Sequence, residues 1–309
     1  MQQLITNALS QIEKFVIGKP QQVRLALACL LAEGHLLIED LPGMGKTTLA
    51  HVLSSSLGLS YQRVQFTSDL LPADVIGVSI FNAEKHSFTL HKGPVFNQVV
   101  LADEINRASP KTQSALLEAM EENSVSIDGN THTLPMPFFV IATQNPLFHA
   151  GTYPLPESQL DRFMMRISLG FPDKQAEKEI LKSASQPLNY ADLSAAISVE
   201  QLQAMQSHIK DVYVSETILE YIIALFEHTR TGQLTMNPLS PRAGKALVAA
   251  AKAWAFMDNR DHVLSDDIKS VFSSVCEHRM AGRHNQGNES FSNQLLSLVD
   301  SEQFYSHDS

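Results

Sequence analysis

A glycine-rich loop followed by a lysine and two threonines carries the clearest chemistry in this sequence. The apolar run His35–Glu39 predicts a short strand, and a helical pattern that ends at Gly58 follows the loop. The loop and helix start supply Pro42, Gly43, Met44, Gly45, Lys46, Thr47 and Thr48. Glycines let backbone N–H groups wrap a phosphate, and a helix N-terminus favours the same anion. The segment therefore predicts a phosphate cradle in which Lys46 reaches the β and γ oxygens and Thr47 binds Mg²⁺.

One position of this loop departs from the usual G-x-x-x-x-G-K-T spacing. Asp40 stands where the first glycine of that pattern would be. Aspartate tolerates left-handed backbone better than most residues, so we expect the loop to keep its shape. The alternative is a chance Gly-Lys-Thr at a helix start, and the strand that precedes the loop argues against it.

Polar residues also follow two other apolar runs. Asp103 and Glu104 come directly after Val99–Ala102, and Asn145 closely follows Phe138–Thr143. Because successive strand residues point to opposite faces, we expect Asp103 to hold the Mg²⁺ shell and Glu104 to polarise an attacking water. Asn145 can hold that water from a rigid strand end. Taken alone, the acidic pair is more typical of a solvated turn, and Asn-Pro of a plain turn.

Two arginines each allow two interpretations. Arg162 lies in a short helical segment where it pairs with Asp161 or Glu157, or projects into the nucleotide of a neighbouring subunit. Arg242 follows a Ser240-Pro241 helix start, where it faces a phosphate or is simply solvated.

The elements that must position these side chains change character near Pro172. Before it, helical patterns alternate with β-like runs at His35–Glu39, Tyr61–Phe66, Val99–Ala102, Phe138–Thr143 and Met164–Leu169. Two hairpins interrupt them, at Val78–Phe81 with Phe88–Leu90 and at Val125–Ile127 with Thr131–Leu134. Beyond Pro172, helical periodicity covers Lys174–Ser183, Val199–Lys210, Ser215–Thr229, Pro241–Met257 and Ser265–Arg279. This order predicts a parallel sheet covered by helices, followed by an all-helical domain.

Composition limits the class of protein. The 309 residues carry 33 acidic and 23 basic side chains, for a net charge of −10, which argues against nonspecific binding to nucleic acid or anionic lipid. No apolar run is long enough to span a bilayer, and no secretion signal is evident, so we expect a cytoplasmic protein without direct membrane insertion. Cys29 and Cys276 are predicted to be buried, inert thiols, and no compact spacing predicts a structural metal site.

In this order, the segments resemble the AAA+ ATPases and, among them, the MoxR family. The finer similarity lies in Gln65–Asp74, Lys92–Phe96, Leu101–Ala108, Lys111–Glu122 and Val140–Pro146. The resemblance implies a P-loop NTPase fold, α/β in class, with a three-layer αβα sandwich, a parallel sheet of order 5-1-4-3-2 and a small all-helical lid. The implied domains are 1–172, a nucleotide-binding domain with helix 2 insert and pre-sensor 1 hairpins; 173–285, a helical lid; and 286–309, a polar tail.

The resemblance also implies roles for individual residues. Gly43–Thr48 match Walker A, Asp103 and Glu104 match Walker B, and Asn145 matches sensor 1. Arg162 matches the arginine finger and Arg242 the sensor 2 arginine, which binds a nucleotide in its own subunit or in a neighbour. Val16, Ile17 and Gly18 resemble the segment that packs on adenine.

The implied activity is hydrolysis of ATP to ADP and phosphate, with Mg²⁺, by a ring that in relatives is a hexamer. Members of the family are thought to act as chaperones that activate a partner complex, often one with a von Willebrand factor A domain. Three alternatives stay open: a nucleotide-gated scaffold with negligible turnover, a metal-chelatase motor subunit, and a nucleic-acid machine. The absence of an evident basic stripe and of an appended helix-turn-helix argues against the last.

Overall fold

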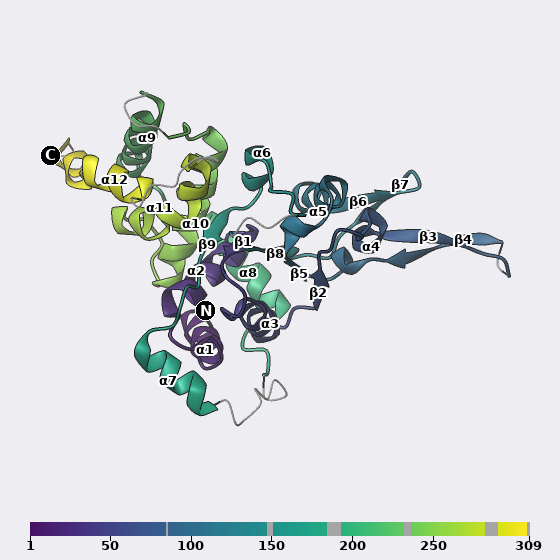
Figure 1. Ribbon diagram of the computed structural model, residues 1–309. Coiled ribbons are helices and arrows are strands. Elements are labelled where there is room, and N and C mark those ends of the chain that lie inside the picture. The colour runs from purple at the N-terminus through teal and green to yellow at the C-terminus, as the bar shows by residue number, and fades with distance from the viewer. Residues whose placement is uncertain (85, 147–150, 184–192, 232–235, 282–289, 308–309) are drawn as a thin grey trace.

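The computed structural model describes residues 1–84, 86–146, 151–183, 193–231, 236–281 and 290–307 (Figure 1). The strands are β1 Leu36–Glu39, β2 Tyr61–Gln65, β3 Gly77–Asn82, β4 Ser87–Lys92, β5 Val99–Asp103, β6 Ser124–Ile127, β7 Asn130–Thr133, β8 Phe139–Gln144 and β9 Met165–Ile167. The helices are α1 Gln2–Glu13, α2 Pro20–Leu31, α3 Lys46–Ser56, α4 Pro72–Ile76, α5 Pro110–Glu122, α6 Glu157–Leu160, α7 Lys174–Ser183, α8 Val199–Lys210, α9 Glu216–Arg230, α10 Pro241–Met257, α11 Ser265–Met280 and α12 Phe291–Leu298.

The central sheet is parallel and has the order β2-β5-β8-β1-β9. Numbered among the sheet strands alone, this is 5-1-4-3-2, so the expected order is confirmed. β1 lies between β8 and β9, with Leu36 opposite Ile141 on one side and Met165 on the other. The loop that follows β1 therefore lies inside the carboxyl edge of the sheet, between the ends of β8 and β9, where parallel sheets bind ligands.

Apolar side chains on both faces of the sheet bury it between helices. Leu36 and Ile38 belong to a core shared with α1, α2 and α3, whereas Leu37 points into a second core shared with α5. Strand β5 is buried along its whole length, as its uninterrupted apolar run predicts. The three-layer αβα sandwich is thus confirmed.

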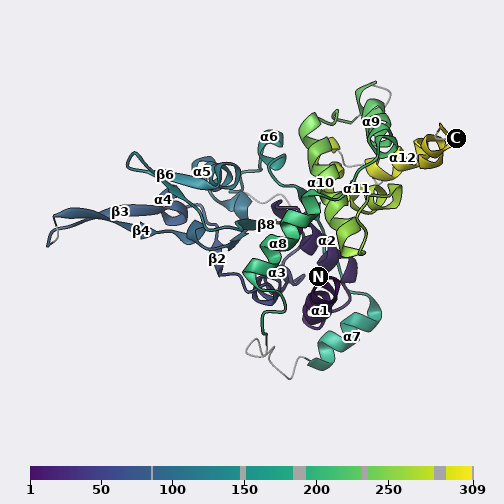
Figure 2. The same cartoon turned by 180° about the vertical axis from the view of Figure 1, so that it is seen from behind.

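Helices α9, α10, α11 and α12 form the lid at one end of the molecule, whereas α7 and α8 lie against the α/β part (Figures 1 and 2). Helix α10 begins as predicted, with Ser240 as N-cap: its Oγ accepts a hydrogen bond from Ala243 N at 3.2 Å, and Pro241 occupies the first turn. Helix α8 packs on α2 as well as on α10, and Gln206 Nε2 donates to Leu30 O at 3.0 Å. The helical part is therefore joined to the α/β layers through a continuous core.

The predicted polar tail contains a folded piece. Helix α12 buries Phe291 and Leu295, and its first turn is held by Glu277 of α11. The Glu277 carboxylate accepts bonds from Phe291 N at 3.0 Å and Ser292 N at 2.8 Å. Burial raises the pKa of this carboxyl, but the hydrogen bonds from residues 290–292 outweigh that effect and lower it overall.

Both predicted hairpins form, and both project from the end of the molecule opposite the lid (Figures 1 and 2). β3 and β4 pair antiparallel, with Phe81 opposite Phe88, and the two rings meet edge to face at 5.3 Å. Phe88 is 72% exposed. This hairpin thus presents aromatic surface that no element of the described chain covers.

For three buried titratable residues, His35, Cys29 and Cys276, burial favours the neutral form. Val140 N donates to Nδ1 of His35 at 3.0 Å, so Nε2 carries the proton and faces Met120 O at 3.1 Å. Burial lowers the pKa of His35 to about 4. Cys29 and Cys276 are both free and buried; burial raises the pKa of both thiols, that of Cys276 to about 12, which makes them unreactive as predicted.

Among the described helices, none combines the length and the apolar composition that crossing a bilayer would require.

Candidate functional site

The glycine loop and the two strand ends meet in one pocket, of about 440 Å³, at the carboxyl edge of the sheet. The loop contributes Pro42, Gly43, Gly45, Lys46, Thr47 and Thr48, and the neighbouring strand ends contribute Arg63, Gln65, Asp103, Glu104 and Asn145. Gly43 and Gly45 have φ of 87° and 89°, a region that side chains with a Cβ rarely adopt. A Cβ built at either glycine would meet open space, so it is the backbone conformation that requires glycine there.

The Lys46 ammonium lies against the loop itself. Its Nζ donates to the carbonyl oxygens of Asp40 at 2.6 Å and Leu41 at 3.2 Å. Partial burial lowers the pKa of Lys46, and the charges of Asp40, Asp103 and Glu104 oppose that shift. Both acceptors that Lys46 has in the described part of the chain are neutral carbonyls, so its charge remains available to an anionic ligand in this pocket.

Asp40 has a different role from the one that the sequence suggested. Its backbone is not among those with positive φ in the described chain, so the expectation that aspartate replaces glycine for its left-handed tolerance is wrong. Its buried carboxylate instead accepts hydrogen bonds from Ser168 Oγ at 2.9 Å, Gly170 N at 3.3 Å and Leu169 N. Asp40 thus ties the start of the loop to the segment after β9.

Replacing Asp40 with alanine is expected to lower the free energy of unfolding by about 3 kcal/mol, because the buried N–H of Leu169 and the half-buried N–H of Gly170 lose a charged acceptor. The urea midpoint at constant m-value measures this loss. Asp40→Asn keeps one acceptor oxygen and should lose distinctly less. An alanine variant with the wild-type midpoint would show that the tie contributes nothing.

Both carboxylates line the pocket, although we expected them to point in opposite directions. Glu104 has φ 56° and ψ 51°, so the chain leaves the strand in a left-handed turn and its side chain swings to the same side as that of Asp103. Asp103 is 8% exposed, and its Oδ1 accepts from Thr143 Oγ1 at 2.6 Å. Thr143 Oγ1 in turn accepts from Glu104 N at 2.9 Å, so one threonine fixes both acidic residues.

Cationic and amide partners of these carboxylates escaped the sequence analysis. Arg63 donates to Asp103 Oδ2 from Nε at 3.1 Å and from Nη2 at 2.6 Å. Gln65 Nε2 and Arg107 Nη1 each donate to Glu104 Oε2 at 2.9 Å. Arg63 and Gln65 are two residues apart on one strand, so their side chains lie on the same face of it. That spacing points to the acidic pair only once β2 is known to lie beside β5.

The oxygen atoms of the pocket fit the expected magnesium ion. Thr47 and Asp103 both line it, and hydroxyl and carboxylate oxygens are ligands that Mg²⁺ accepts. Asn145 lies one residue beyond β8 and lines the same pocket. The described residues hold no group of three or more histidine, cysteine or acidic side chains arranged for a metal ion, in this pocket or outside it.

A second, more apolar pocket of about 560 Å³ adjoins the other side of the glycine loop. It is lined by Val16, Ile17 and Met44 together with Phe171, Ile180 and Leu181, of which the last two come from α7. Gly18 has φ 74°, and a Cβ there would lie 2.4 Å from Cβ of Ala176, so this glycine permits α7 to pack closely. The apolar lining of this pocket suits a purine base, and the contribution of α7 was not foreseen.

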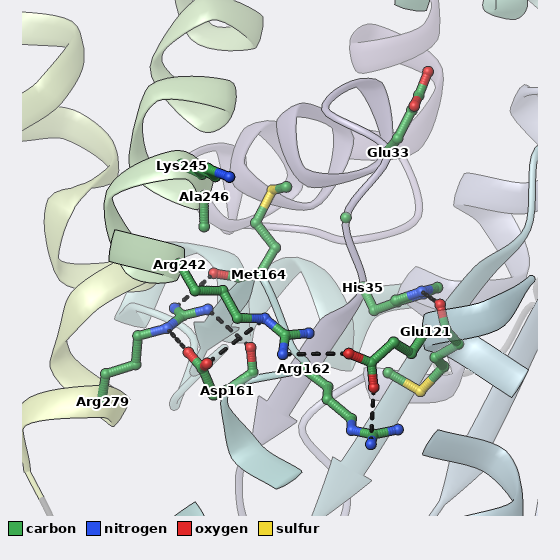
Figure 3. A pocket seen from close by; sticks show the side chains of 12 residues that line it. Glu33, His35, Glu121, Asp161, Arg162, Met164, Arg242, Lys245, Ala246 and Arg279 are labelled. Atoms are coloured by element: carbon green, nitrogen blue, oxygen red, sulfur yellow. Dashed lines mark hydrogen bonds and ion pairs between the residues drawn. The ribbon is translucent and has the colours of Figure 1, made fainter. Parts of the chain in front are cut away.

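The two arginines lie in a different pocket, not among the residues that line the glycine-loop pocket (Figure 3). Arg162, 28% exposed, donates to Leu117 O at 2.5 Å and pairs with Glu121 at 2.8 Å. It therefore folds back on α5 rather than pairing with Asp161 or Glu157, as one interpretation proposed. Arg242, half exposed, lies 3.5 Å from Glu121 and 3.6 Å from Asp161. The structure brings Arg162 and Arg242 together, but apart from the lysine and the acidic pair.

Comparison with known proteins agrees with this arrangement. Residues 35–165 match the family described as ATPase family associated with various cellular activities (AAA), and residues 227–297 match the AAA lid domain. The chaperone MoxR1 of Mycobacterium tuberculosis is 37% identical over 89% of this chain and 75% of its own length. An uncharacterized protein of Bacillus subtilis, YeaC, is 45% identical over 90% of this chain and 87% of its own length.

A crystal structure from Cytophaga hutchinsonii, described as that of a candidate ATPase, superposes with a TM-score of 0.88. It is 37% identical to this chain, and the match covers 97% of this chain and 95% of that one. Protein MoxR of Methylorubrum extorquens is 30% identical over 87% of this chain and 85% of its own length. By its sheet order, its glycine loop and these relatives, the chain belongs to the MoxR family of AAA+ ATPases.

Proposed function

We propose that this protein hydrolyses ATP to ADP and phosphate as a ring of identical subunits, and that it uses the nucleotide cycle to remodel or activate a partner protein. The observation that carries the proposal is the separation of the two polar pockets. The glycine-loop pocket has the phosphate cradle, the acidic pair and Asn145. The other pocket has Arg162 and Arg242. A second copy of the chain can bring its arginines to the first pocket, as arginine fingers do.

In this mechanism the residues of one subunit bind ATP and prepare the water. The loop N–H groups and Lys46 hold the β- and γ-phosphates, while Val16, Ile17 and Met44 line the purine pocket and Gly18 lets α7 pack close to it. Glu104 accepts a proton from the attacking water, and Asn145 orients that water. Thr47 and Asp103 would hold Mg²⁺, which would supply positive charge to offset that of the phosphates. Arg162 and Arg242 of the adjacent subunit stabilise the charge that develops on the γ-phosphate.

The proposed client is a protein, and the family resemblance favours one with a von Willebrand factor A domain. The relative named chaperone MoxR1 supports a chaperone role. The two hairpins at the end opposite the lid provide exposed surface that a client can contact, with Phe81 and Phe88 at the longer one. Coupling to nucleotide would run through the lid, whose Arg242 lies at the start of α10.

Specific ATPase activity is expected to rise with protein concentration and to level off where assembly is complete, because each site needs arginines from a neighbour. The measurement is steady-state turnover per subunit across a dilution series, with sedimentation velocity on the same samples. Activity that stays constant while the species dissociate to monomers would contradict the ring mechanism.

A further inference from the structure

The pocket that contains the two arginines is organised around one carboxylate. Glu121, near the end of α5, offers a different oxygen to each arginine: Oε2 lies 2.8 Å from Arg162 Nη2, and Oε1 lies 3.5 Å from Arg242 Nη1 (Figure 3). The arginines come from different parts of the fold, since Arg162 precedes β9 and Arg242 opens α10 of the lid. Glu121 therefore contacts both arginines at once, one oxygen to each.

The rest of the cluster fixes each arginine from its other side. Arg162 Nη1 donates to Leu117 O, one turn earlier on α5 than Glu121. Arg242 Nε faces Asp161 Oδ2 at 3.6 Å, and Asp161 Oδ1 accepts from Arg279 Nε at 2.6 Å. Arg279 is only 7% exposed, so Asp161 has a rigid support. Positive and negative side chains thus alternate in one network of ion pairs that joins α5, the turn before β9, α10 and α11. Its members in order are Arg162, Glu121, Arg242, Asp161 and Arg279.

Stability does not explain this position of Glu121. The side chain is 39% exposed, and ion pairs at such exposure contribute about 0–1 kcal/mol. A carboxylate in the last turn of a helix also opposes the helix dipole, which favours cations there. The two guanidinium groups would repel each other if their shared carboxylate were absent. What Glu121 supplies is orientation, because it keeps both cations in one pocket.

We propose that Glu121 is a positioning residue, which aligns Arg162 and Arg242 as a unit for the nucleotide of the neighbouring subunit. The inference rests on the proposed function, because it needs those arginines to act on a neighbour. Glu121 touches neither water nor phosphate; it acts through the arginines. Its loss should slow the chemical step in the neighbour and leave nucleotide binding in its own glycine loop intact.

The first test is Glu121→Gln, with Glu122→Gln as the matched control at the adjacent exposed residue of α5. We expect kcat to fall roughly 10- to 100-fold, as misplaced catalytic groups cause, with KM for ATP and the oligomeric state unchanged. Glu121→Asp keeps the charge on a shorter side chain, so its kcat should lie between those of the wild type and Glu121→Gln. Wild-type turnover in Glu121→Gln would overturn the proposal, and so would a rise, which would mean that the carboxylate restrains the arginines.

The second test separates action on a neighbour from damage within the subunit. Mixing Glu121→Gln with Lys46→Ala, which keeps intact arginines but has an impaired cradle, should restore turnover above the sum of the two variants alone. A Glu121→Gln site then receives arginines that a normal Glu121 has aligned. A mixture that shows only the sum would overturn the proposal, since the defect would then lie within the altered subunit.

Arg162→Ala, measured in parallel, distinguishes this inference from the proposed function. If Arg162→Ala loses turnover and Glu121→Gln does not, only the role of Glu121 is wrong. If Arg162→Ala turns over normally, the ring mechanism fails and the role of Glu121 fails with it.

Discussion

Arg162→Ala is expected to lower ATP turnover by about 10³-fold or more, the range in which arginine fingers act, while ATP binding is retained. The reason is geometric, because Arg162 lies in a pocket apart from the glycine loop of its own subunit. Its guanidinium can stabilise the transition state of a neighbour but contributes nothing to the cradle that holds ATP. Steady-state turnover, measured beside the affinity for a fluorescent ATP analogue, checks both parts.

The control for this variant is Arg24→Ala. Arg24 has nearly the same side-chain exposure, 29%, pairs with Asp258, and lines neither the glycine-loop pocket nor the pocket of the two arginines. It should retain turnover within a factor of two or so, as a surface change does. Equal losses of turnover in the two variants would show that the effect of Arg162→Ala is structural. Retained turnover in Arg162→Ala would show that Arg162 does not act as an arginine finger.

Glu104→Gln is the second change with a large expected effect, a fall in turnover of about 10²- to 10⁴-fold, typical for the loss of a general base. Glutamine has the same shape and can still contact Gln65 and Arg107, so the pocket should keep its form. ATP binding should persist and the ATP-bound state should accumulate. Single-turnover hydrolysis of bound ATP measures the chemical step directly.

Asp103→Asn tests the division of labour between the adjacent carboxylates. Since Asp103 is the expected magnesium ligand, this variant should lose the Mg²⁺ dependence of nucleotide binding, whereas Glu104→Gln should keep it. If both variants lost binding alike, the two acids would share one role. Wild-type turnover in Glu104→Gln would show that a residue other than Glu104 is the general base.

Local pattern was enough to predict most of the fold. The helices Val199–Lys210 and Pro241–Met257 begin and end where the sequence analysis placed them, because a serine cap starts each of them and the apolar period sets its length. The strands differ by one to a few residues at their ends, most at Met165–Ile167. Their order in the sheet came from the resemblance to a family and not from the strands themselves.

The contacts within the site could not be predicted in this way. Arg63 of β2 contacts Asp103 of the neighbouring strand β5, and Arg162 contacts Glu121 of α5. Asp40 contacts residues that follow β9. The partners in each pair are distant in the chain. No local spacing encodes such pairs. The left-handed turn at Glu104 also lacked a signal, since glutamate rarely adopts it; only the threonine on β8 that holds its N–H explains the conformation.

The hydrogen bond from Leu169 N to the Asp40 carboxylate joins residues that are 129 positions apart in the chain. During synthesis, a nascent chain that has not yet released Leu169 from the ribosome has β1 and the glycine loop but not the partner that fixes the loop's first residue. Contacts of such long range form late, because the entropy of closing the loop must be overcome first. We expect ATP to bind well only after the whole α/β domain has been synthesised. Nucleotide would therefore stabilise the complete domain and not a partly synthesised one.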